Sequence, residues 1–508
     1  MADQKISQLT DGTSFQAGDE AVVNRSGTNY KVDPTVFQTL TAEEATISRL
    51  NVGANLAWNS STDTYTANTT PTTVTKIHQG MKRCLLRDDG TVNYYLDPTD
   101  STQKLDGSAA DLTGADGNVM VEIPRFYFRQ VKNGNTTTWQ ISDVPLAGYQ
   151  LHPAFFKNGE IVDFRYIGAY DAALKFSRSI TTVADAGGGD ITVTTSAQHP
   201  LYAGDTVTIS GTTSYDGDYT VVSRASGTTF TVTAAFVATE TGTASGFVSG
   251  KNLDDMTSNI DTATDELAAI SGEYPLVGVT RDECRDLAAN VGTGFRQQDF
   301  WLTCAVQLLY LVEYGTFYSQ NQLGNGNTGA SYVSSSDDQT DSPHSVAGKS
   351  NALGNASTDT TSGASSASRD TAYMSYRGIE NFYGNCFNFV DGFNIGIVVD
   401  RDAFVSNNDA DFADDTSTNY TDLGITMAFA NGFVQNIADV PGAFLPNDPY
   451  GASSSTYLTD YFYQSTGNRV ALFGGTADAS SGHAGVFYWY VNQSSSSSSR
   501  VRGARLAY

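Results

Sequence analysis

The chain has 508 residues, of which 40% are hydrophobic and only 17% are charged. It is long enough for about three domains of ordinary size, and its many Gly, Ser, Thr, Asn and Asp residues favour short strands joined by turns. The formal net charge of −26 opposes contact with phosphate backbones, so nucleic acid is not an expected partner. The composition predicts an α+β protein that is mostly β.

The first residues, MADQKISQLTDGTSF, contain no apolar stretch of the kind found in a signal peptide. No part of the sequence approaches the roughly 20 consecutive apolar residues that a membrane-spanning helix requires. We therefore expect synthesis in a cytoplasm and no membrane insertion. The four cysteines lie far apart and form no CxxC pair, so we expect buried thiols and neither a zinc site nor a redox motif.

Residues 1–45 form a short leading segment in which DEAVVNRSGTNYKVD predicts a hairpin that turns at Ser26 and Gly27. A segment of this size cannot bury a core alone, so we expect it to dock onto another protein. It resembles the leading peptide of many phage tail and fibre proteins, which attaches those proteins to the virion. The polar stretch 59–75, rich in Thr and Asn, is predicted to be a linker.

Residues 46–177 form a first β-rich region, with strand patterns at VEIPRFYFR, interrupted by Pro124, and at WQIS. His152, which precedes Pro153, is expected to be a structural histidine. Residues 178–249 then change character, because four segments alternate with period two between turns rich in Gly and Asp. This pattern predicts a small β-sandwich or barrel that is inserted into a larger domain.

Residues 250–508 open with two predicted helices. Thr280 and Glu283 form a capping box ahead of the first. The second has apolar residues on one face from Trp301 to Val312, at spacings of three and four. We expect both helices to lie in the core. Residues 331–370 are so polar that burial cannot offset their ordering entropy, which predicts a long exposed Ser-rich loop.

The motifs of common enzymes are missing from the sequence. The five histidines form no local metal-ligand pair, and the HExxH, C2H2 and GxSxG patterns do not occur. Residues 324–329 match GxGxxG but follow a helix, whereas a dinucleotide site needs this motif after a strand. We therefore expect a flexible turn there.

The acidic run beginning at Asn407, Asp409 and Asp411 imitates an EF-hand loop, but Phe412 stands where glycine is required. We predict no catalytic residue, no metal and no cofactor. The two carboxylates of a glycan-cleaving enzyme are brought together by the fold and have no fixed spacing in the sequence. Glycan cleavage therefore stays open as an alternative.

Three segments resemble the C-type-lectin-type fold that formylglycine-generating enzymes share with the variable proteins of diversity-generating retroelements. They are the capped helix with GFRQQDFW at 294–301, ENFYGNCFNFVDG at 380–392, and GARL at 503–506. Phage members of this group share phrases similar to VEIPRFYFR, GYQLHPAF, YIGAY and LLYLVEYGTFYSQNQLGNG. The resemblance covers roughly 75–177 and 250–508, and it implies a C-type-lectin-type fold interrupted by the β module.

The resemblance implies binding and not oxidase chemistry. Formylglycine-generating enzymes need reactive cysteines late in the domain, and none follows Cys386 here. In the retroelement proteins a segment near the C-terminus displays the diversified residues on a rigid scaffold. The corresponding segment here combines aromatic residues, six serines and two arginines, which suit an adaptable contact surface.

The predicted receptor-binding residues are Tyr488, Tyr490, Asn492, Gln493, Ser494, Ser496, Ser498, Arg500 and Arg502. Phe487 and Trp489 alternate with Tyr488 and Tyr490, so one pair is expected to face the core. The serines are equally compatible with a plain surface loop.

The sequence thus predicts a bacteriophage virion structural protein, made in the host cytoplasm, that acts as a receptor-binding tail fibre or tail-tip protein. Its leading segment would bind other virion proteins, and its C-terminal lectin-type domain would take part in host attachment by recognising a surface glycan or protein. The phage resemblance implies a homotrimer. Two alternatives stay open, namely a head fibre or capsid decoration protein with a structural role, and a glycan-cleaving fibre.

Overall fold

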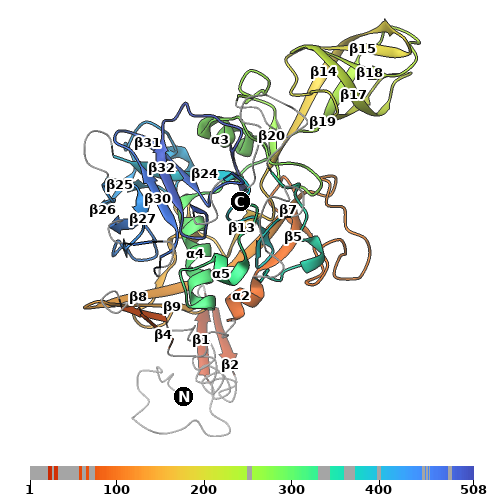
Figure 1. Ribbon diagram of the computed structural model, residues 1–508. Helices are drawn as coiled ribbons and strands as arrows, with labels where there is room; N and C mark the ends of the chain where they lie inside the picture. The colour runs from red at the N-terminus through yellow and green to blue at the C-terminus, as the bar shows by residue number, and fades with distance from the viewer. Residues whose placement is uncertain are drawn as a thin grey trace. The chain divides into compact units, whose positions relative to one another are not determined.

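A computed structural model of the chain is mostly β, as the composition predicts (Figure 1). It describes residues 75–248, 255–329, 344–359, 372–396, 402–448, 452–453, 456, 458–478 and 483–508, together with four strands within 21–67. The chain divides into two compact units, Met1–Gly53 and Ala54–Tyr508.

The described residues of the first unit form an antiparallel pair, β1 (Ala21–Arg25) and β2 (Thr28–Val32). Arg25 is opposite Thr28, which confirms the predicted hairpin. The predicted turn residues, Ser26 and Gly27, lie outside the described residues.

The second unit begins with a five-stranded antiparallel sheet. Its strands, in spatial order, are β10 (Gln150–Leu151), β8 (Tyr127–Asn133), β9 (Thr136–Ser142), β3 (Leu56–Asn59) and β4 (Thr64–Ala67). The linker predicted for 59–75 is therefore wrong at β4, which pairs with β3. The sequence TYTA in β4 alternates residues with high strand propensity, and pairing satisfies its backbone groups.

A six-stranded sheet adjoins it. Its strands, in spatial order, are β21 (Arg296–Gln297), β34 (Leu506–Ala507), β13 (Phe164–Gly168), β7 (Asn118–Pro124), β5 (Lys82–Leu86) and β6 (Val92–Tyr95). β7 is buried except at Pro124, where it ends because proline has no N–H to donate. The late strand β34 pairs with both β13 and β21, so it joins distant parts of the chain.

The predicted β module is a closed six-stranded barrel. Its strands are β14 (Ala173–Gly187), β15 (Asp190–Thr195), β16 (Thr206–Ser210), β17 (Gly217–Ser226), β18 (Thr229–Thr233) and β19 (Gly242–Val248). The barrel closes because β14 pairs with both β15 and β19. β14 begins ahead of the predicted boundary at 178, since its first residues also pair with β20 (Glu266–Ala268).

The largest sheet carries the C-terminal part of the chain. Its strands, in spatial order, are β26 (Thr421–Thr426), β25 (Asp402–Val405), β24 (Phe387–Ile395), β31 (Arg469–Phe473), β32 (Trp489–Gln493), β30 (Tyr461–Gln464) and β27 (Gly432–Phe433), with β33 (Arg502–Gly503) parallel to β24. Three short hairpins complete the strands: β11 (Phe156–Lys157) with β12 (Glu160–Ile161), β22 (Ser375–Tyr376) with β23 (Ile379–Glu380), and β28 (Asn436–Ile437) with β29 (Pro446–Asp448).

Among the described residues, the helices are α2 (Lys76–Gly80), α3 (Arg281–Asn290), α4 (Phe300–Tyr314) and α5 (Gln320–Leu323), with 3₁₀ turns η2 (Pro153–Phe155), η3 (Asn351–Leu353) and η4 (Asp409–Asp411). The capping box of α3 is confirmed. α4 lies in the core as expected, and its burial extends beyond the apolar residues predicted on one face. It contacts both β24 and β9, and every residue from Phe300 to Glu313 is buried. Within the described part of the chain, no helix is long and apolar enough to cross a membrane.

The predicted Ser-rich loop is wrong for residues 344–359, which are ordered against the core. Ser350 is buried, and its N–H and hydroxyl both donate to the Glu380 carboxylate, each at 2.6 Å. Polar residues such as Ser350 can be buried because they form hydrogen bonds to polar partners. The apolar content of a sequence does not reveal such bonds. The rest of the predicted loop falls mostly in 330–343 and 360–371, outside the described residues.

The predicted flexible turn at 324–329 is also wrong. Asn327 and Thr328 are buried, and Asn327 donates to Asn385 at 2.9 Å. Gly326 has a φ of 65°, and a Cβ there would lie 3.2 Å from the Met374 side chain. The glycine pattern therefore belongs to a tightly packed turn.

Candidate functional site

The Gln298 N–H of the first resembling segment donates to the Arg505 carbonyl at 2.7 Å, and the other two resembling segments meet around one buried carboxylate, Asp171. It accepts hydrogen bonds from Arg505 at 2.5 Å, from Asn385 at 2.9 Å and from Asn388 at 3.0 Å. The Arg505 guanidinium also donates to the backbone carbonyls of Gly168, Glu380 and Asn381. These bonds fix the chain immediately after the predicted binding segment.

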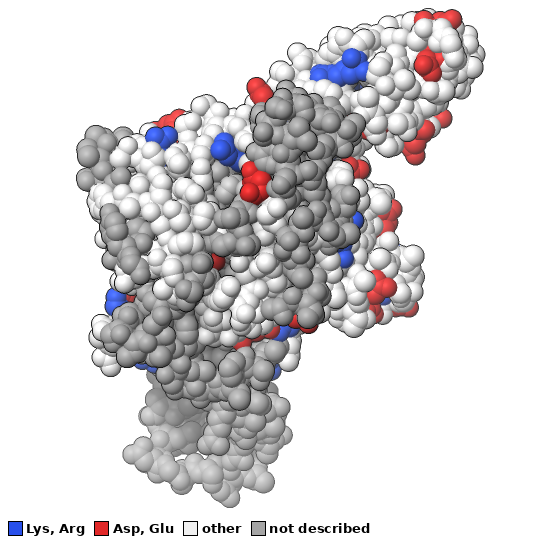
Figure 2. All heavy atoms as spheres, in the orientation of Figure 1, with Lys and Arg blue, Asp and Glu red and all other residues white. Residues whose placement is uncertain are grey.

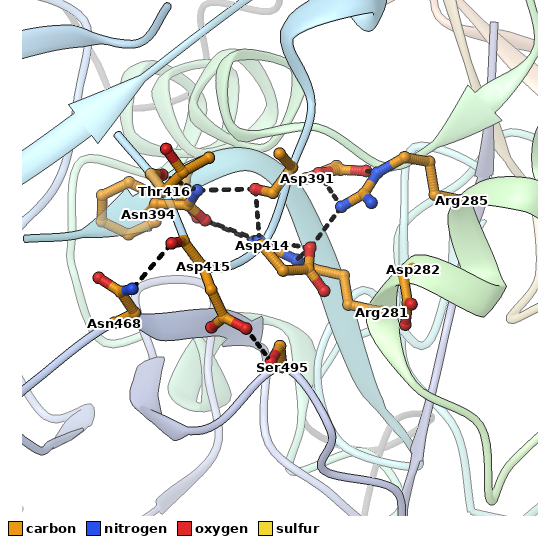
Figure 3. A network of polar contacts seen from close by, with 12 residues as sticks. Arg281, Asp282, Arg285, Asp391, Asn394, Asp414, Asp415, Thr416, Asn468 and Ser495 are labelled. Atoms are coloured by element: carbon orange, nitrogen blue, oxygen red, sulfur yellow. Dashed lines mark hydrogen bonds and ion pairs between the residues drawn. The ribbon is translucent and has the colours of Figure 1, made fainter. Parts of the chain in front are cut away.

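A second buried network begins at the bulge of β24, where the register with β31 shifts between Val390 and Asn394 (Figure 3). Asp391 in this bulge accepts two hydrogen bonds from Arg285, at 2.6 and 3.0 Å, and one from Gln297 at 2.8 Å. Burial alone would raise the pKa of Asp391, but the charges of Arg285 and Arg281 lower it overall. The carboxylate is therefore held in its charged form.

The same arginines extend this network outward to a loop. Both Arg281 and Arg285 donate to Asp414, at 2.9 and 2.5 Å. Asn394 donates to the carbonyls of Ala413 and Thr416 at 2.7 and 2.8 Å. The loop 413–416 is thus tied to α3 and β24 through buried charges and amides.

The loop 413–416 in turn contacts the predicted binding segment (Figure 3). Ser495 donates its hydroxyl hydrogen to the Asp415 carboxylate, and Asn468 donates to the Asp415 carbonyl at 2.9 Å. Asp415 therefore bridges the serine segment and the turn between β30 and β31.

The serine segment 494–499 folds as a compact turn after β32. The Ser497 N–H donates to the Ser494 carbonyl at 3.1 Å, and the Ser497 hydroxyl donates to Gln493 at 2.8 Å. Arg502 donates to the Ser497 hydroxyl at 2.5 Å. Ser494 and Ser496 are exposed, so this ordered turn presents hydroxyl groups to solvent.

Two predicted site residues are buried, which corrects the predicted surface. Tyr488 is only 2% exposed and stacks on Phe387 with ring centroids 5.7 Å apart. Arg500 is 5% exposed, because the chain turns inward there to bring Val501 against Phe387. The other predicted residues, Tyr490, Asn492, Gln493, Ser494, Ser496, Ser498 and Arg502, are exposed or half-buried.

The expected alternation of core and surface pairs is wrong for the same stretch. Phe487, Tyr488 and Trp489 are all buried, and Tyr490 is the first half-exposed ring. The strand begins only at Trp489, after a turn in which the Tyr488 N–H donates to the Gly485 carbonyl at 3.2 Å. Residues in a turn do not alternate between two faces.

An aromatic surface that the sequence analysis missed lies beside the serine segment. It consists of the half-buried rings of Phe433, Tyr461, Tyr463, His483 and Tyr490. Ring centroids are 5.1 Å apart for Phe433 and Tyr461, 4.7 Å for Tyr461 and Tyr463, and 5.1 Å for Tyr463 and Tyr490. The alternation in YFYQ indicates that Tyr461 and Tyr463 share a face, but sequence alone does not show that this strand pairs with β32.

Few charged side chains are visible in Figure 2 over the region where Figure 1 shows β30, β31 and β32. Apart from Asp415 and Arg502, which bind the serine segment, and the His483 ring, the polar groups named at the serine segment and aromatic surface are amides and hydroxyls. Gln493 donates to the Tyr490 hydroxyl at 2.9 Å, and Gln464 donates to the Phe429 carbonyl at 3.1 Å. We call the aromatic surface together with Asn492, Gln493, Ser494 and Ser496 the C-terminal contact surface.

Other polar residues singled out from the sequence have structural contacts. His152 is fully buried among the rings of Phe126, Phe128 and Trp301, as expected of a structural histidine, and burial lowers its pKa to about 3. Asp409 forms an ion pair with Arg296 at 2.6 Å. No group of three or more His, Cys, Asp and Glu side chains suited to a metal ion occurs in the described ranges.

The four cysteines are buried free thiols, as predicted: Cys84, Cys284, Cys304 and Cys386. Burial raises the pKa of Cys284, Cys304 and Cys386 well above the ordinary thiol value, so these thiols are poor nucleophiles.

The sequence matches no protein-family model, and a search of the curated proteins also finds no match.

Proposed function

We propose that this chain is a bacteriophage virion structural protein, a receptor-binding tail fibre or tail-tip protein that contacts a host surface through a C-terminal lectin-type domain. The observation that carries the proposal is the C-terminal contact surface. It combines half-exposed aromatic rings with exposed hydroxyl groups, which suits recognition of another surface. The buried networks around Asp171 and Asp391 support it, because preorganised contact residues lose less entropy on binding.

The remaining parts of the chain fit the same proposal. The hairpin β1–β2 belongs to the segment that we propose attaches to other virion proteins, and a homotrimer is the assembly that we propose. The meeting of two resembling segments around Asp171, and the hydrogen bond from Gln298 of the third to the Arg505 carbonyl, support a lectin-type fold. The barrel would then be an insertion within that fold.

Adsorption to intact candidate host bacteria tests this proposal. Replacing Ser494 and Ser496 by Glu adds two charges at exposed positions, so we expect the folded variant to lose cell binding. Replacing the exposed barrel residues Thr220 and Ala225 by Glu is the matched control, and it should bind like the wild type. Equal binding by both variants would remove the serine segment from the site. Failure of the wild-type protein to bind any candidate host would favour the structural role.

One observation favours that second candidate, a head fibre or capsid decoration protein. Phe156, Ile161 and Phe164 are 50%, 59% and 43% exposed, and Phe156 is directly opposite Ile161 in the hairpin β11–β12. Exposed apolar groups clustered in this way are typical of subunit contacts. Copy number per virion separates the two candidates, because decoration requires far more copies than a tail fibre.

A further inference from the structure

The aromatic surface has a geometry fixed by strand register. In the parallel pair β30–β32, Tyr463 is directly opposite Tyr490. In the antiparallel pair β27–β30, Phe433 is directly opposite Tyr461. Tyr461 and Tyr463 flank the fully buried Phe462, so they emerge on the other face of their strand. Four rings therefore form a continuous row across three adjacent strands.

The row is supported from below by the core. Tyr490 contacts the buried Phe387 ring, with centroids 5.1 Å apart. His483 packs against Tyr461 with centroids 4.4 Å apart. The rings are thus held in place before any ligand arrives, which reduces the entropy that binding would cost.

The polar side chains that flank the row are amides and hydroxyls. Gln464, Gln493 and Asn492 supply amides, and Ser494 and Ser496 supply hydroxyls, all half-buried or exposed. Amides and hydroxyls both donate and accept hydrogen bonds, as the hydroxyl groups of a sugar do. At one end of the row, Phe429 next to Gln464 is 58% exposed. A row of flat rings flanked by such groups matches a sugar chain, whose C–H faces carry partial positive charge toward the negative face of an aromatic ring.

We propose that the aromatic surface binds a neutral, linear oligosaccharide whose successive sugar rings stack on Tyr461, Tyr463 and Tyr490, while Phe433, which meets Tyr461 edge to face at 82°, lies at the end of the row. This inference rests on the proposed function and gives its ligand class. The amides and hydroxyls beside the row favour a neutral ligand, and the net charge of −26 disfavours an acidic polysaccharide. A chain of sugars is favoured over a single sugar because the row extends over four rings.

Binding of the full-length protein to an array of purified bacterial polysaccharides, neutral and acidic, tests the inference. We expect binding to neutral linear polysaccharides. Tyr463→Leu keeps an apolar side chain but removes the flat face, so affinity should fall roughly tenfold, the size expected of one aromatic contact. Tyr463→Phe keeps the flat face and should bind within a factor of about two of the wild type.

Several outcomes would overturn the inference. The first is that the protein binds no neutral polysaccharide, and the second is that it binds acidic polysaccharides alone. The third is that Tyr463→Leu and Tyr463→Phe have equal affinity. Periodate oxidation of host cells distinguishes this inference from the proposed function, since it destroys sugar diols but leaves most surface protein in place. If adsorption survives periodate but is lost when Ser494 and Ser496 are replaced by Glu, the proposed function stands and a glycan ligand is excluded. Adsorption lost after periodate, and weakened by Tyr463→Leu, would support both.

Discussion

Asp460 is the residue whose ionisation most directly affects the strands of the contact surface. Its carboxylate is 1% exposed and accepts a hydrogen bond from the Phe487 N–H at 2.7 Å. A Cβ on Gly485 would lie 2.1 Å from this carboxylate, so glycine is required for the close approach. Burial raises the pKa of Asp460 to about 7, although the hydrogen bond from the Phe487 N–H opposes the shift. The carboxyl group thus changes charge near neutral pH.

This shift predicts a specific pH dependence of stability. The folded pKa exceeds the unfolded value, so the stabilising contribution is complete below about pH 4 and is lost as pH rises through 7. Its total is on the order of 4 kcal/mol. In Asp460→Asn this dependence should disappear, because the amide still accepts from Phe487 but does not titrate. Urea denaturation of both proteins at pH 5 and pH 8 measures the difference. Identical pH dependence in the two proteins would contradict the assignment.

The ion pair of Arg505 with Asp171 yields a second prediction. Both side chains are buried, and Asp171 keeps only two amide donors if Arg505 is removed. We expect Arg505→Met to lower the free energy of unfolding by about 3–5 kcal/mol, because an uncompensated charge remains buried. Adding Asp171→Asn removes that charge, so the double variant should lose less than the two single losses together. Strict additivity would argue against this coupling.

At the residue scale, local chemistry was predictable and burial of polar groups was not. The capping box at Thr280 and the buried state of the cysteines follow from residue type and spacing. Buried Arg505 donates to the Glu380 carbonyl, more than a hundred residues away in the sequence. Buried Ser350 donates to the Glu380 carboxylate, about thirty residues away. Such pairs leave no local pattern in the sequence.

Among the elements, β24 shows how one glycine supports a whole network. Gly392 has a φ of 67°, and a Cβ there would lie 2.5 Å from the Ser406 carbonyl oxygen. The adjacent Asp391 is thereby directed toward Arg285. The bulge thus links strand geometry to the loop that contacts Ser495.

Gly392→Ala should therefore destabilise the protein more than a glycine substitution that meets no steric barrier. Gly187 is the matched control, because its φ is 77° and no atom lies within 4 Å of an added Cβ. We expect Gly187→Ala to cost about 1–2 kcal/mol from backbone conformation alone. The cost at Gly392 should exceed this by at least about 2 kcal/mol, since a backbone atom must move as well. If Gly392→Ala and Gly187→Ala had equal midpoints in urea denaturation, the bulge would relax without strain.

The strands were predicted best where period-two alternation is local, as in the barrel. The linker predicted for 59–75 is wrong at β4: its partner β3 is close in sequence, but β3 in turn pairs with the distant β9, which no local pattern reveals. The row of rings at Tyr461 and Tyr490 likewise depends on a parallel pairing between strands far apart in sequence. Hydrophobic periodicity identifies a strand face but not the neighbouring strand.

For the whole molecule, the dominant electrostatic property is the net charge of −26. Like charges at this density repel one another and disfavour the compact state. We expect the midpoint of thermal unfolding to rise when the salt concentration increases from about 0.01 to about 0.15 M, because the screening length falls from about 30 to about 8 Å. An equal osmolality of sucrose controls for effects unrelated to charge. A midpoint that falls with salt would mean that attractive ion pairs outweigh the repulsion.

The position of β34 has a consequence for the order in which the protein forms. Residues 506–507 lie between β13 and β21, so the six-stranded sheet that starts at Lys82 stays incomplete until they leave the ribosome. The barrel, whose six strands all lie between 173 and 248, meets no such delay. During translation the barrel is therefore free to fold first, while the surrounding strands wait for their last partner. A nascent chain stalled before residue 506 would expose an unpaired sheet edge to chaperones and to other nascent chains.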